Sequence, residues 1–487
     1  MGKSGFSGPL ERVNDYLWRI PRSYKPEMRV DGLIYASDDL IDLLRSDQAP
    51  EQVANVATLP GIQSASLAMP DIHWGYGFTI GGVCATDPDE GGVISPGGVG
   101  YDINCGVRLI RSNLFYQDVK PHQQRLVDEL FKAVPTGTGR KGKYRFAPDE
   151  LRRLMGQGVP FLKDRGLATD ADIEFTEAHG CLDGADPELV SDRAVERGLS
   201  QCGTLGSGNH FLEVQVVDTI FDEQAAQVMG IEKDMVCVMI HSGSRGLGYQ
   251  VCDDALRMLR GVPEKYGIKL PDRQLACAPV NSPEGTHYLG AMRAAANYAW
   301  CNRQLLMWQA REVFERVFEE PWQSLQLGLV YDVAHNIAKF EEHSIDEARK
   351  RVWVHRKGAT RAFPPGHAEI PDRYRAIGQP VLIPGDMGRA SWVLVGQPGS
   401  MEQTFGTTCH GAGRVMSRTK AIRHAKGRRI DMELKQRGVI ARAQSWKGLA
   451  EEQPDAYKDV NLVVDVVHSA GLSKKVARMR PLGVIKG

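Results

Sequence analysis

Five side chains that commonly bind metal ions stand beside turns or at the ends of predicted strands. Asp102 and Cys105 lie three residues apart in one glycine-flanked turn. A carboxylate is a hard donor and a thiolate a soft one, so the pair suits a borderline divalent ion such as zinc or manganese. His210, His241 and His335 each adjoin a predicted β-strand. Because strand ends can converge on one point, these residues predict a metal centre.

The number of candidate ligands exceeds what one ion needs. A single tetrahedral ion with an open position takes three protein ligands. Five donors that include a thiolate therefore indicate two ions, with Cys105 as the bridging ligand. Pairs of closely spaced ions are a known solution for phosphoryl-transfer chemistry.

A second reactive side chain, His410, lies in the segment Thr407–Arg414. Small residues and glycines surround it, and we expect them at the start of a helix, where backbone N–H groups favour phosphate. The residue type leaves three roles open for His410, namely a metal ligand, a general base and a covalent nucleophile.

Positive charge concentrates near His410 although the whole chain is neutral, with 60 Lys and Arg against 60 Asp and Glu. Seven basic and no acidic residues lie between Arg414 and Arg429. Arg414 and Arg418 would share one face of the predicted helix. Further basic residues occur at 356–361 and in the C-terminal tail. A charge run is usually a solvated face, but this concentration favours a groove for a nucleic-acid backbone.

Hydrophobic patterning predicts an α+β protein, a single large catalytic unit of mixed β-sheets surrounded by helices. Short β-branched runs predict strands, several of them too continuously apolar to be half-exposed. These strands are expected at Val107–Ile110, Phe211–Val217, Met235–Ile240, Leu327–Val333, Arg351–His355, Pro380–Ile383 and Ser391–Val395. Helical periodicity is clearest at Thr286–Phe318, with weaker helices at Gln123–Ala133, Asp186–Arg197 and Ala412–His424.

Residues 1–487 are expected to form one domain, because the candidate site residues run from position 71 to position 486. Residues 137–180, richer in charge and glycine, are expected as a peripheral insertion. No stretch approaches the ~18 apolar residues of a membrane-spanning helix. Nine scattered cysteines and an N-terminus without an apolar signal region indicate a cytoplasmic protein. We expect a monomer that does not bind membranes.

Several motifs together resemble the RtcB family of RNA ligases, the tRNA-splicing ligases, over essentially the whole chain. The matching stretches are Met69–Gly77, Ser95–Gly106, Gly206–Glu213, His241–Gly246, Tyr331–Asn336, His355–Arg361, Cys409–Arg414 and Ala477–Gly487. The resemblance implies the RtcB-type fold. It also implies a GTP- and manganese-dependent ligase that joins an RNA 3′-phosphate or 2′,3′-cyclic phosphate to a 5′-hydroxyl.

The resemblance also implies ligand sets and roles. Asp102, Cys105 and His210 would hold one manganese ion, and Cys105, His241 and His335 the second. His410 would take GMP as a phosphoramidate, with Asp71 to orient or deprotonate it. The implied guanosine contacts are Asn209, His210, Phe211, Leu212, Glu213, His335, Asn336, Pro384, Gly385, Asp386, Met387, Ser391, His410, Gly411, Ala412, Gly413 and Lys486.

Two of the implied guanosine contacts are acidic. Glu213 is expected to read the guanine edge, because a carboxylate accepts from its N1–H and amino group while adenine offers no such pair. Asp386 departs from the family, which often has Pro-Gly-Ser-Met where this chain has Pro-Gly-Asp-Met. A carboxylate would repel a triphosphate, so Asp386 is expected to face the base or ribose.

RNA is the expected partner, together with an archease-type activator. The basic residues of the matched motifs are expected to contact RNA phosphates: Arg245, Lys357, Arg414 and Arg418. Two alternatives remain open. One is a binuclear metallophosphoesterase acting on RNA ends with water as the nucleophile, for which the metal ligands alone would serve. The other is a nucleic-acid-binding protein with a structural metal.

Overall fold

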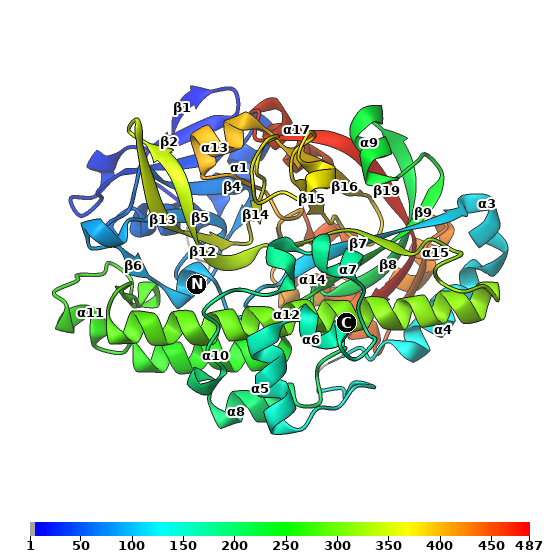
Figure 1. Cartoon of the computed structure of the whole chain (residues 1–487). Coiled ribbons are helices and arrows are strands. Elements are labelled where there is room, and N and C mark those ends of the chain that lie inside the picture. The colour runs from blue at the N-terminus through cyan, green and yellow to red at the C-terminus, as the bar shows by residue number, and fades with distance from the viewer. Residues whose placement is uncertain (1–4, 138) are drawn as a thin grey trace.

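Two large β-sheets, with helices packed around them, make up the computed structural model, which describes residues 5–137 and 139–487 (Figure 1). Most neighbouring strands are antiparallel, whereas two pairs, β3 with β4 and β18 with β19, are parallel. The predicted α+β class with mixed sheets is therefore confirmed.

The first sheet combines N-terminal strands with two strands from the second half of the chain. Its order is β1 (Glu11–Asn14), β2 (Leu17–Ile20), β3 (Asp31–Tyr35), β4 (Ala65–His73), β5 (Ile80–Thr86), β13 (Ala348–Lys357) and β12 (Asn336–Ile345). His355 of β13 pairs with Cys84 of β5. This pairing brings β4, which carries Asp71, toward the loops of the C-terminal half.

The second sheet brings the ends of several distant strands to one edge. Its order is β11 (Gly328–Ala334), β7 (Gly106–Phe115), β9 (Met235–Ser242), β8 (Phe211–Ile220), β19 (Ser473–Lys486), β16 (Ser391–Gly396) and β15 (Pro380–Ile383), with β18 (Ile440–Ala443) beside β19. Gly106 pairs with Ser242 and Ala334, and Phe211 pairs with His241 and Lys486. All seven predicted strands are confirmed.

Two strands of the second sheet, β15 and β16, contribute to two hydrophobic cores at once. Val381 and Ile383 pack with the core of the first sheet, whereas Leu382 between them packs with the core of the second. Because successive side chains of a strand point to opposite faces, a strand buried on both faces joins two cores. Two short pairs complete the strands, β6 (Val93–Ile94) with β10 (Ala278–Pro279) and β14 (Thr360–Arg361) with β17 (Thr407–Thr408).

The longest helix, α12 (Pro283–Phe318), runs along both sheets with α10 (Arg245–Met258) beside it (Figure 1). Its predicted position is confirmed, although it begins three residues earlier than Thr286. Ser282 accepts a hydrogen bond from the Gly285 amide, and proline is favoured at the first helical position. The predicted helix α4 (Gln123–Ala133) has the expected bounds.

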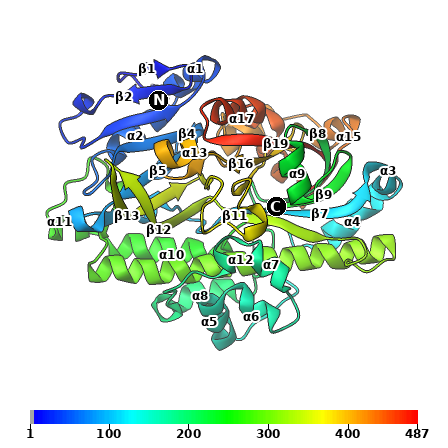
Figure 2. The ribbon, with the colours of Figure 1, turned by 45° about the horizontal axis from the view of Figure 1, so that its top comes forward.

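An outer group of short helices lies on the side of α12 away from the sheets (Figure 2). It consists of α5 (Pro148–Gln157), α6 (Val159–Lys163), α7 (Asp170–Glu174) and α8 (Asp192–Gly198). The insertion predicted at 137–180, which includes one residue outside the described part of the chain, overlaps this group and stays a prediction. The remaining helices are α1 (Asp38–Ser46), α2 (Ala49–Val56), α3 (Tyr116–Val119), α9 (Glu223–Met229), α11 (Val262–Lys265), α13 (Pro398–Thr404), α14 (Arg418–His424), α15 (Ile430–Gln436), α16 (Trp446–Glu451) and α17 (Val460–Ser469).

Two predicted helices are wrong in extent. The helix expected at Ala412–His424 is confined to α14, because Ser417 caps it by accepting from the Lys420 amide. His410 is therefore not at a helix start, and Arg414 and Arg418 do not share a helix face. The helix expected at Asp186–Arg197 divides at Ser191, which caps α8. Among the described residues, no helix is both long enough and apolar enough to span a membrane.

A buried ionic cluster supports the edge where the strand ends meet. Asp332 accepts from both Arg108 and Arg303, and all three side chains are fully buried. Arg303 also donates to the carbonyls of Asn104 and Ser242. One guanidinium thus fixes the turn before β7 and the end of β9.

Replacing Arg303 with methionine should strongly destabilise the protein, because Asp332 would lose a buried partner and two carbonyls would lose their donor. We expect the free energy of unfolding to fall by about 3–5 kcal/mol. Chemical denaturation of both proteins measures the difference. Arg349→Met is the control, because its ion pair with Glu342 is exposed and should contribute less than about 1 kcal/mol. Equal effects of the two substitutions would contradict a supporting role for Arg303.

Candidate active site

A cavity of about 240 Å³ lies where the two sheets approach each other and receives side chains from both. The residues that line it are His73, Ile80, Asp102, Cys105, Asn209, Phe211, Glu213, His241, His335, Asn336, Gly358, Pro384, Gly385, Asp386, Met387, His410, Gly411, Ala412, Gly413, Arg414, Arg418, Glu452, Tyr457 and Lys486. Reactive side chains from segments far apart in the sequence therefore line one cavity.

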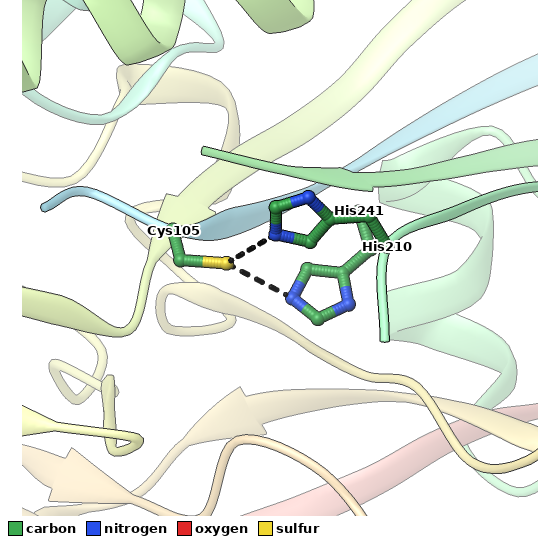
Figure 3. A group of neighbouring side chains, drawn as sticks. All are labelled: Cys105, His210 and His241. Atoms are coloured by element: carbon green, nitrogen blue, oxygen red, sulfur yellow. Dashed lines mark hydrogen bonds between the residues drawn. The ribbon is translucent and has the colours of Figure 1, made fainter. Parts of the chain in front are cut away.

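A thiol and two imidazoles form the centre of the metal-ligand cluster (Figure 3). Cys105 Sγ lies 3.4 Å from His210 Nε2 and 3.2 Å from His241 Nε2. The three donor atoms lie within 4.8 Å of one another, and all three residues are buried. This spacing allows one ion to contact all three.

The other two predicted metal ligands adjoin this cluster. Asp102 Oδ2 is 2.9 Å from His210 Nε2, and His335 Nε2 is 3.3 Å from His241 Nε2. The five donors therefore run in a chain from a carboxylate through the thiol to His335. The structure brings all five together, and metal binding by them stays a prediction.

The strand edge explains why these residues converge. Cys105 immediately precedes β7, His210 precedes β8, and His241 lies near the end of β9. His335 separates β11 from β12, and its amide donates to the Cys105 carbonyl. Asn104 has a positive φ of 52°, a left-handed conformation that asparagine tolerates better than most residues. This turn points the Cys105 side chain toward the histidines.

Burial controls the protonation of the cluster. It raises the pKa of the Cys105 thiol well above the ordinary value, and the Asp102 charge raises it further. Burial likewise lowers the pKa of His241 and His335, and neighbouring histidines add to the effect. Near neutral pH the site therefore presents a protonated thiol beside neutral imidazoles. A cation that displaces the thiol proton would be bound by the resulting thiolate and by the neutral imidazoles beside it.

Asp71 holds the loop of His410 through three hydrogen bonds to one oxygen atom. Asp71 Oδ2 lies 2.5 Å from His410 Nδ1 and accepts from the amides of His410 and Gly411 at 2.9 and 3.1 Å. The carboxylate is fully buried. A carboxylate can only accept here, so Nδ1 donates and Nε2 is the nitrogen available for chemistry. The His410 ring lies 4.8 Å from the His335 ring, centroid to centroid.

Lys458 fixes the backbone on both sides of Asp71. Its Nζ donates to the carbonyls of Pro70 at 3.0 Å and Ile72 at 2.6 Å. Its amide donates to the Gly413 carbonyl. A Cβ at Gly413, where φ is +74°, would lie 2.2 Å from the Asp71 carbonyl oxygen. Burial would raise the pKa of Asp71, but His410 and Lys458 together lower it, so Asp71 is ionised.

A buried carboxyl group, Glu213, lies at another wall of the cavity. Burial raises its pKa to about 7, against the donated hydrogen bond of Gln215 and the charge of Lys486. Gln215 Nε2 donates to Glu213 Oε2 at 2.7 Å and to Ser391 Oγ at 3.0 Å. Lys486 Nζ donates to the Asn209 carbonyl. A buried carboxyl group with few protein partners at a cavity wall is suited to accept hydrogen bonds from the donors of a ligand.

Asp386 is already paired inside the protein. Its Oδ1 accepts from the amides of Gly388 and Arg389, and its Oδ2 accepts from the Arg389 guanidinium at 2.6 Å. The residue lines the cavity, and its charge is one of the influences that raise the pKa of Glu213. Asp386 is thus near the proposed base reader, while the expected contact with base or ribose stays a prediction.

Most residues of the predicted guanosine set line the cavity. Three residues of the set are not in its lining: His210, Leu212 and Ser391. His210 and Leu212 flank Phe211 in the sequence, and Ser391 accepts from Gln215, which also donates to Glu213. Sequence reasoning missed five lining residues: His73, Ile80, Gly358, Glu452 and Tyr457. His73 lies in a matched motif, and burial lowers its pKa to about 4. Glu452 and Tyr457 carry no local signal, because only the fold brings them to the cavity.

The four predicted RNA contacts have different surroundings. Arg414 and Arg418 line the cavity, and both face the buried Glu452, at 3.1 and 3.8 Å. Arg245 Nη1 lies 3.0 Å from His210 Nδ1. Lys357 is buried and donates to the carbonyls of Tyr76 and Phe78, and burial lowers its pKa to about 7. RNA binding by these residues stays a prediction.

The comparisons with known proteins agree in one family. A family model described as "tRNA-splicing ligase RtcB" matches residues 52–487. The chain is 57% identical over 480 residues to the "tRNA-splicing ligase RtcB" of Archaeoglobus fulgidus, and this match covers 99% of each protein. It is 54% identical over 478 residues to that of Methanococcus maripaludis, covering 98% of this chain and 99% of the relative. The "RNA-splicing ligase RtcB" of Mycobacterium bovis is 53% identical over 439 residues, covering 90% of this chain and 100% of the relative.

Replacing Glu213 with glutamine should change how stability depends on pH. The folded protein raises the pKa of Glu213 from 4.5 to about 7, so it holds this proton more tightly than the unfolded chain does. Wild type should therefore lose stability relative to Glu213→Gln as pH rises from about 4.5 through 7, by about 3 kcal/mol in total. Denaturation at pH 5 and pH 8 measures the difference. The exposed Glu196→Gln is the control, and a pH-independent difference for Glu213→Gln would contradict the raised pKa.

Replacing Cys105 with serine should remove the only sulfur donor of the five-residue cluster. A hydroxyl does not ionise at neutral pH, so a shared thiolate would be lost from the site. We expect manganese affinity, measured by calorimetry and by elemental analysis of dialysed protein, to fall at least about tenfold. Cys181→Ser, a half-buried cysteine elsewhere, should bind as wild type does. Unchanged binding by Cys105→Ser would exclude a bridging thiolate.

Proposed function

The chain belongs to the RtcB family of tRNA-splicing ligases, and from this premise we propose that it is an RNA ligase dependent on GTP and manganese. It would join a 3′-phosphate or 2′,3′-cyclic phosphate end to a 5′-hydroxyl end, in tRNA splicing or RNA repair. The observation that carries the proposal is the pairing of His410 with the buried Asp71, beside a cavity lined by His410 and by four of the five metal-ligand candidates. The fifth, His210, contacts Asp102 and Cys105.

The residues around Cys105 fit two divalent ions by the chemistry of their donors. Buried oxygen, nitrogen and sulfur donors together suit manganese or zinc. We assign Asp102, Cys105 and His210 to one ion, and Cys105, His241 and His335 to the other. Bound there, the ions would polarise phosphate oxygens and offset negative charge that develops during phosphoryl transfer.

His410 is the proposed nucleophile toward GTP. Its Nε2 would attack the α-phosphorus, forming a nitrogen–phosphorus bond as the bond to pyrophosphate breaks. Asp71 supports this role in two ways, because it fixes the orientation of the ring and stabilises the positive charge that forms on it. The hydrogen bonds from the two amides to the same oxygen keep Asp71 aligned when that charge appears.

Glu213 is the proposed determinant for guanine. A carboxylate accepts from both the N1–H and the exocyclic amino group of guanine, whereas adenine has no such pair of donors. Phe211 lies two residues before Glu213 on β8, and Lys486 of β19 pairs with Phe211. Both would contact the remainder of the nucleotide. A ligand that leaves this buried carboxyl group unpaired would be rejected.

The RNA steps follow from the guanylylated enzyme. GMP would pass from His410 to the RNA 3′-phosphate, which makes that phosphate a better electrophile. The 5′-hydroxyl would then attack it and GMP would leave; a cyclic phosphate would first be opened by water. Arg245, Lys357, Arg414 and Arg418 are the proposed contacts to RNA phosphates. A monomeric state, a cytoplasmic location and an archease-type activator are further expectations of this proposal.

A binuclear phosphoesterase is the second candidate, because the metal ligands alone would serve it. Such an enzyme uses water as its nucleophile. It does not need a further histidine, outside the metal ligands, that a carboxylate holds in one orientation. His410, with Nδ1 bound to Asp71 and its ring 4.8 Å from that of His335, therefore favours the ligase.

Guanylylation separates the two candidates. Wild type incubated with manganese and GTP labelled on the α-phosphate should keep the label after denaturation, because the nitrogen–phosphorus bond is covalent. His410→Ala should lose this label and the joining of RNA ends by at least about 1,000-fold, with manganese binding close to that of wild type. His287→Ala, at an exposed position of α12, should behave as wild type. Label that persists on His410→Ala would show that another residue is the nucleophile.

A wild-type protein that takes no label but removes RNA terminal phosphates would support the phosphoesterase. The same preparation should be tested for metal content, so that loss of labelling is not caused by an empty site.

A further inference from the structure

Three tyrosine rings, two of them stacked and the third edge-on, lie in contact next to Asp102, one of the metal-ligand candidates. The rings of Tyr101 and Tyr249 lie parallel within 26°, with centroids 4.7 Å apart. The Tyr76 ring meets Tyr101 edge to face at 5.6 Å. Tyr249 is 48% exposed, so part of its ring remains open to solvent. We call these three residues the tyrosine stack.

The tyrosine stack is tied to the proposed metal ligands at two points. Tyr101 immediately precedes Asp102, so the two side chains leave adjacent backbone positions. Tyr249 lies one turn after Arg245 on α10, on the same face of the helix. Arg245 Nη1 in turn lies 3.0 Å from His210 Nδ1. A polymer that reaches from the metal ligands to solvent along α10 would pass Arg245 and then Tyr249.

The charges around the tyrosine stack favour an anionic polymer. The Arg197 guanidinium lies 5.3 Å from the centre of the Tyr249 ring, and this arginine is exposed. Arg245 supplies a second positive charge toward the metal ligands. The nearest acid on α10, Asp253, is paired with Arg257 at 2.6 Å. Exposed aromatic rings between arginines are the arrangement by which proteins hold single-stranded nucleic acid, with bases on the rings and phosphates on the cations.

We propose that the tyrosine stack is a platform for a nucleobase of the RNA strand, within a nucleotide or two of the end that is joined. This inference rests on the proposed function for its substrate class, and it adds a base-binding subsite to that function. The base would stack on Tyr249, and Arg197 and Arg245 would contact the phosphates on either side of it. Because every base has a π face, the platform would accept any sequence.

The guanine of GTP is a poorer occupant for this surface. Glu213, Phe211 and Lys486 form a separate wall of the cavity, from β8 and β19 of the second sheet. The tyrosine stack is built instead from the turns after β4 and before β7 and from α10. A protein partner would not need the ring faces, and its binding would not depend on an RNA base. The experiment below therefore distinguishes a protein partner from RNA.

The experiment combines a protein variant with an altered RNA. Tyr249→Ala removes the exposed ring, whereas Tyr249→Phe keeps it and is the matched control. The RNA has a 3′-phosphate end, with 2-aminopurine or an abasic site at one of its last three nucleotides. Binding is measured by anisotropy, stacking by 2-aminopurine fluorescence, and guanylylation by retention of labelled GMP without RNA.

We expect Tyr249→Ala to bind normal RNA about 5- to 150-fold more weakly than wild type, and Tyr249→Phe to bind within about twofold. The abasic RNA should weaken binding to wild type by a similar factor, and should cause little further loss in Tyr249→Ala. The 2-aminopurine signal should change on binding to wild type and to Tyr249→Phe, but not to Tyr249→Ala. All three proteins should guanylylate alike.

The platform would be excluded if Tyr249→Ala bound normal RNA as wild type does, or if the losses from Tyr249→Ala and the abasic site simply added. Equal weakening of Tyr249→Ala and Tyr249→Phe would assign the effect to the hydroxyl group and also exclude stacking. If wild type failed to guanylylate, the proposed function would fail, but the binding and fluorescence measurements would still decide on the platform.

Discussion

One carboxylate oxygen determines the geometry of the whole site. Asp71 Oδ2 accepts from the His410 ring and from two successive amides of its loop, so it fixes both the position of the loop and the orientation of the ring. That oxygen must itself be held, and Lys458 does so by binding the carbonyls on both sides of Asp71. The pair joins β4 of the first sheet to the loop after β17, a strand of the short β14–β17 pair. Four of the metal-ligand candidates adjoin strands of the second sheet, so the relative position of the two large sheets sets the distance between His410 and those candidates.

The metal-ligand candidates depend on a different kind of support. The thiol and the three imidazoles are buried, and burial keeps Cys105, His241 and His335 uncharged because it raises the pKa of the thiol and lowers the pKa of both histidines. The charges that organise the site lie one layer deeper, in the pairing of Asp332 with Arg108 and Arg303. A permanent ion pair thus shapes the strand ends, and the thiol and the imidazoles can remain neutral until a cation binds.

The sequence was most informative where local pattern and function coincide. Continuous β-branched runs predicted six strands of the second sheet, but neither β18 nor the central β19. The glycine-flanked turn of Asp102 and Cys105 predicted the candidate centre. The helix predicted at 412–424 was wrong in extent, because Ser417 caps a helix that begins only at Arg418. Nothing local shows that a carboxylate more than 300 residues away accepts hydrogen bonds from the amides of His410 and Gly411. Tyr457 and Glu452 were missed for the same reason. Residues that act through contacts between distant parts of the chain have no characteristic spacing in the sequence by which they could be recognised.

The central position of β19 has a consequence for synthesis of the protein. This strand lies between β8 and β16 and pairs with both, yet it begins only at Ser473. While the ribosome is still translating the preceding residues, β8 and β16 each present an unpaired apolar edge. Such edges readily pair with other chains. The nascent protein would therefore be most prone to aggregation in the interval after β8 and β16 are synthesised and before β19 can pair with them.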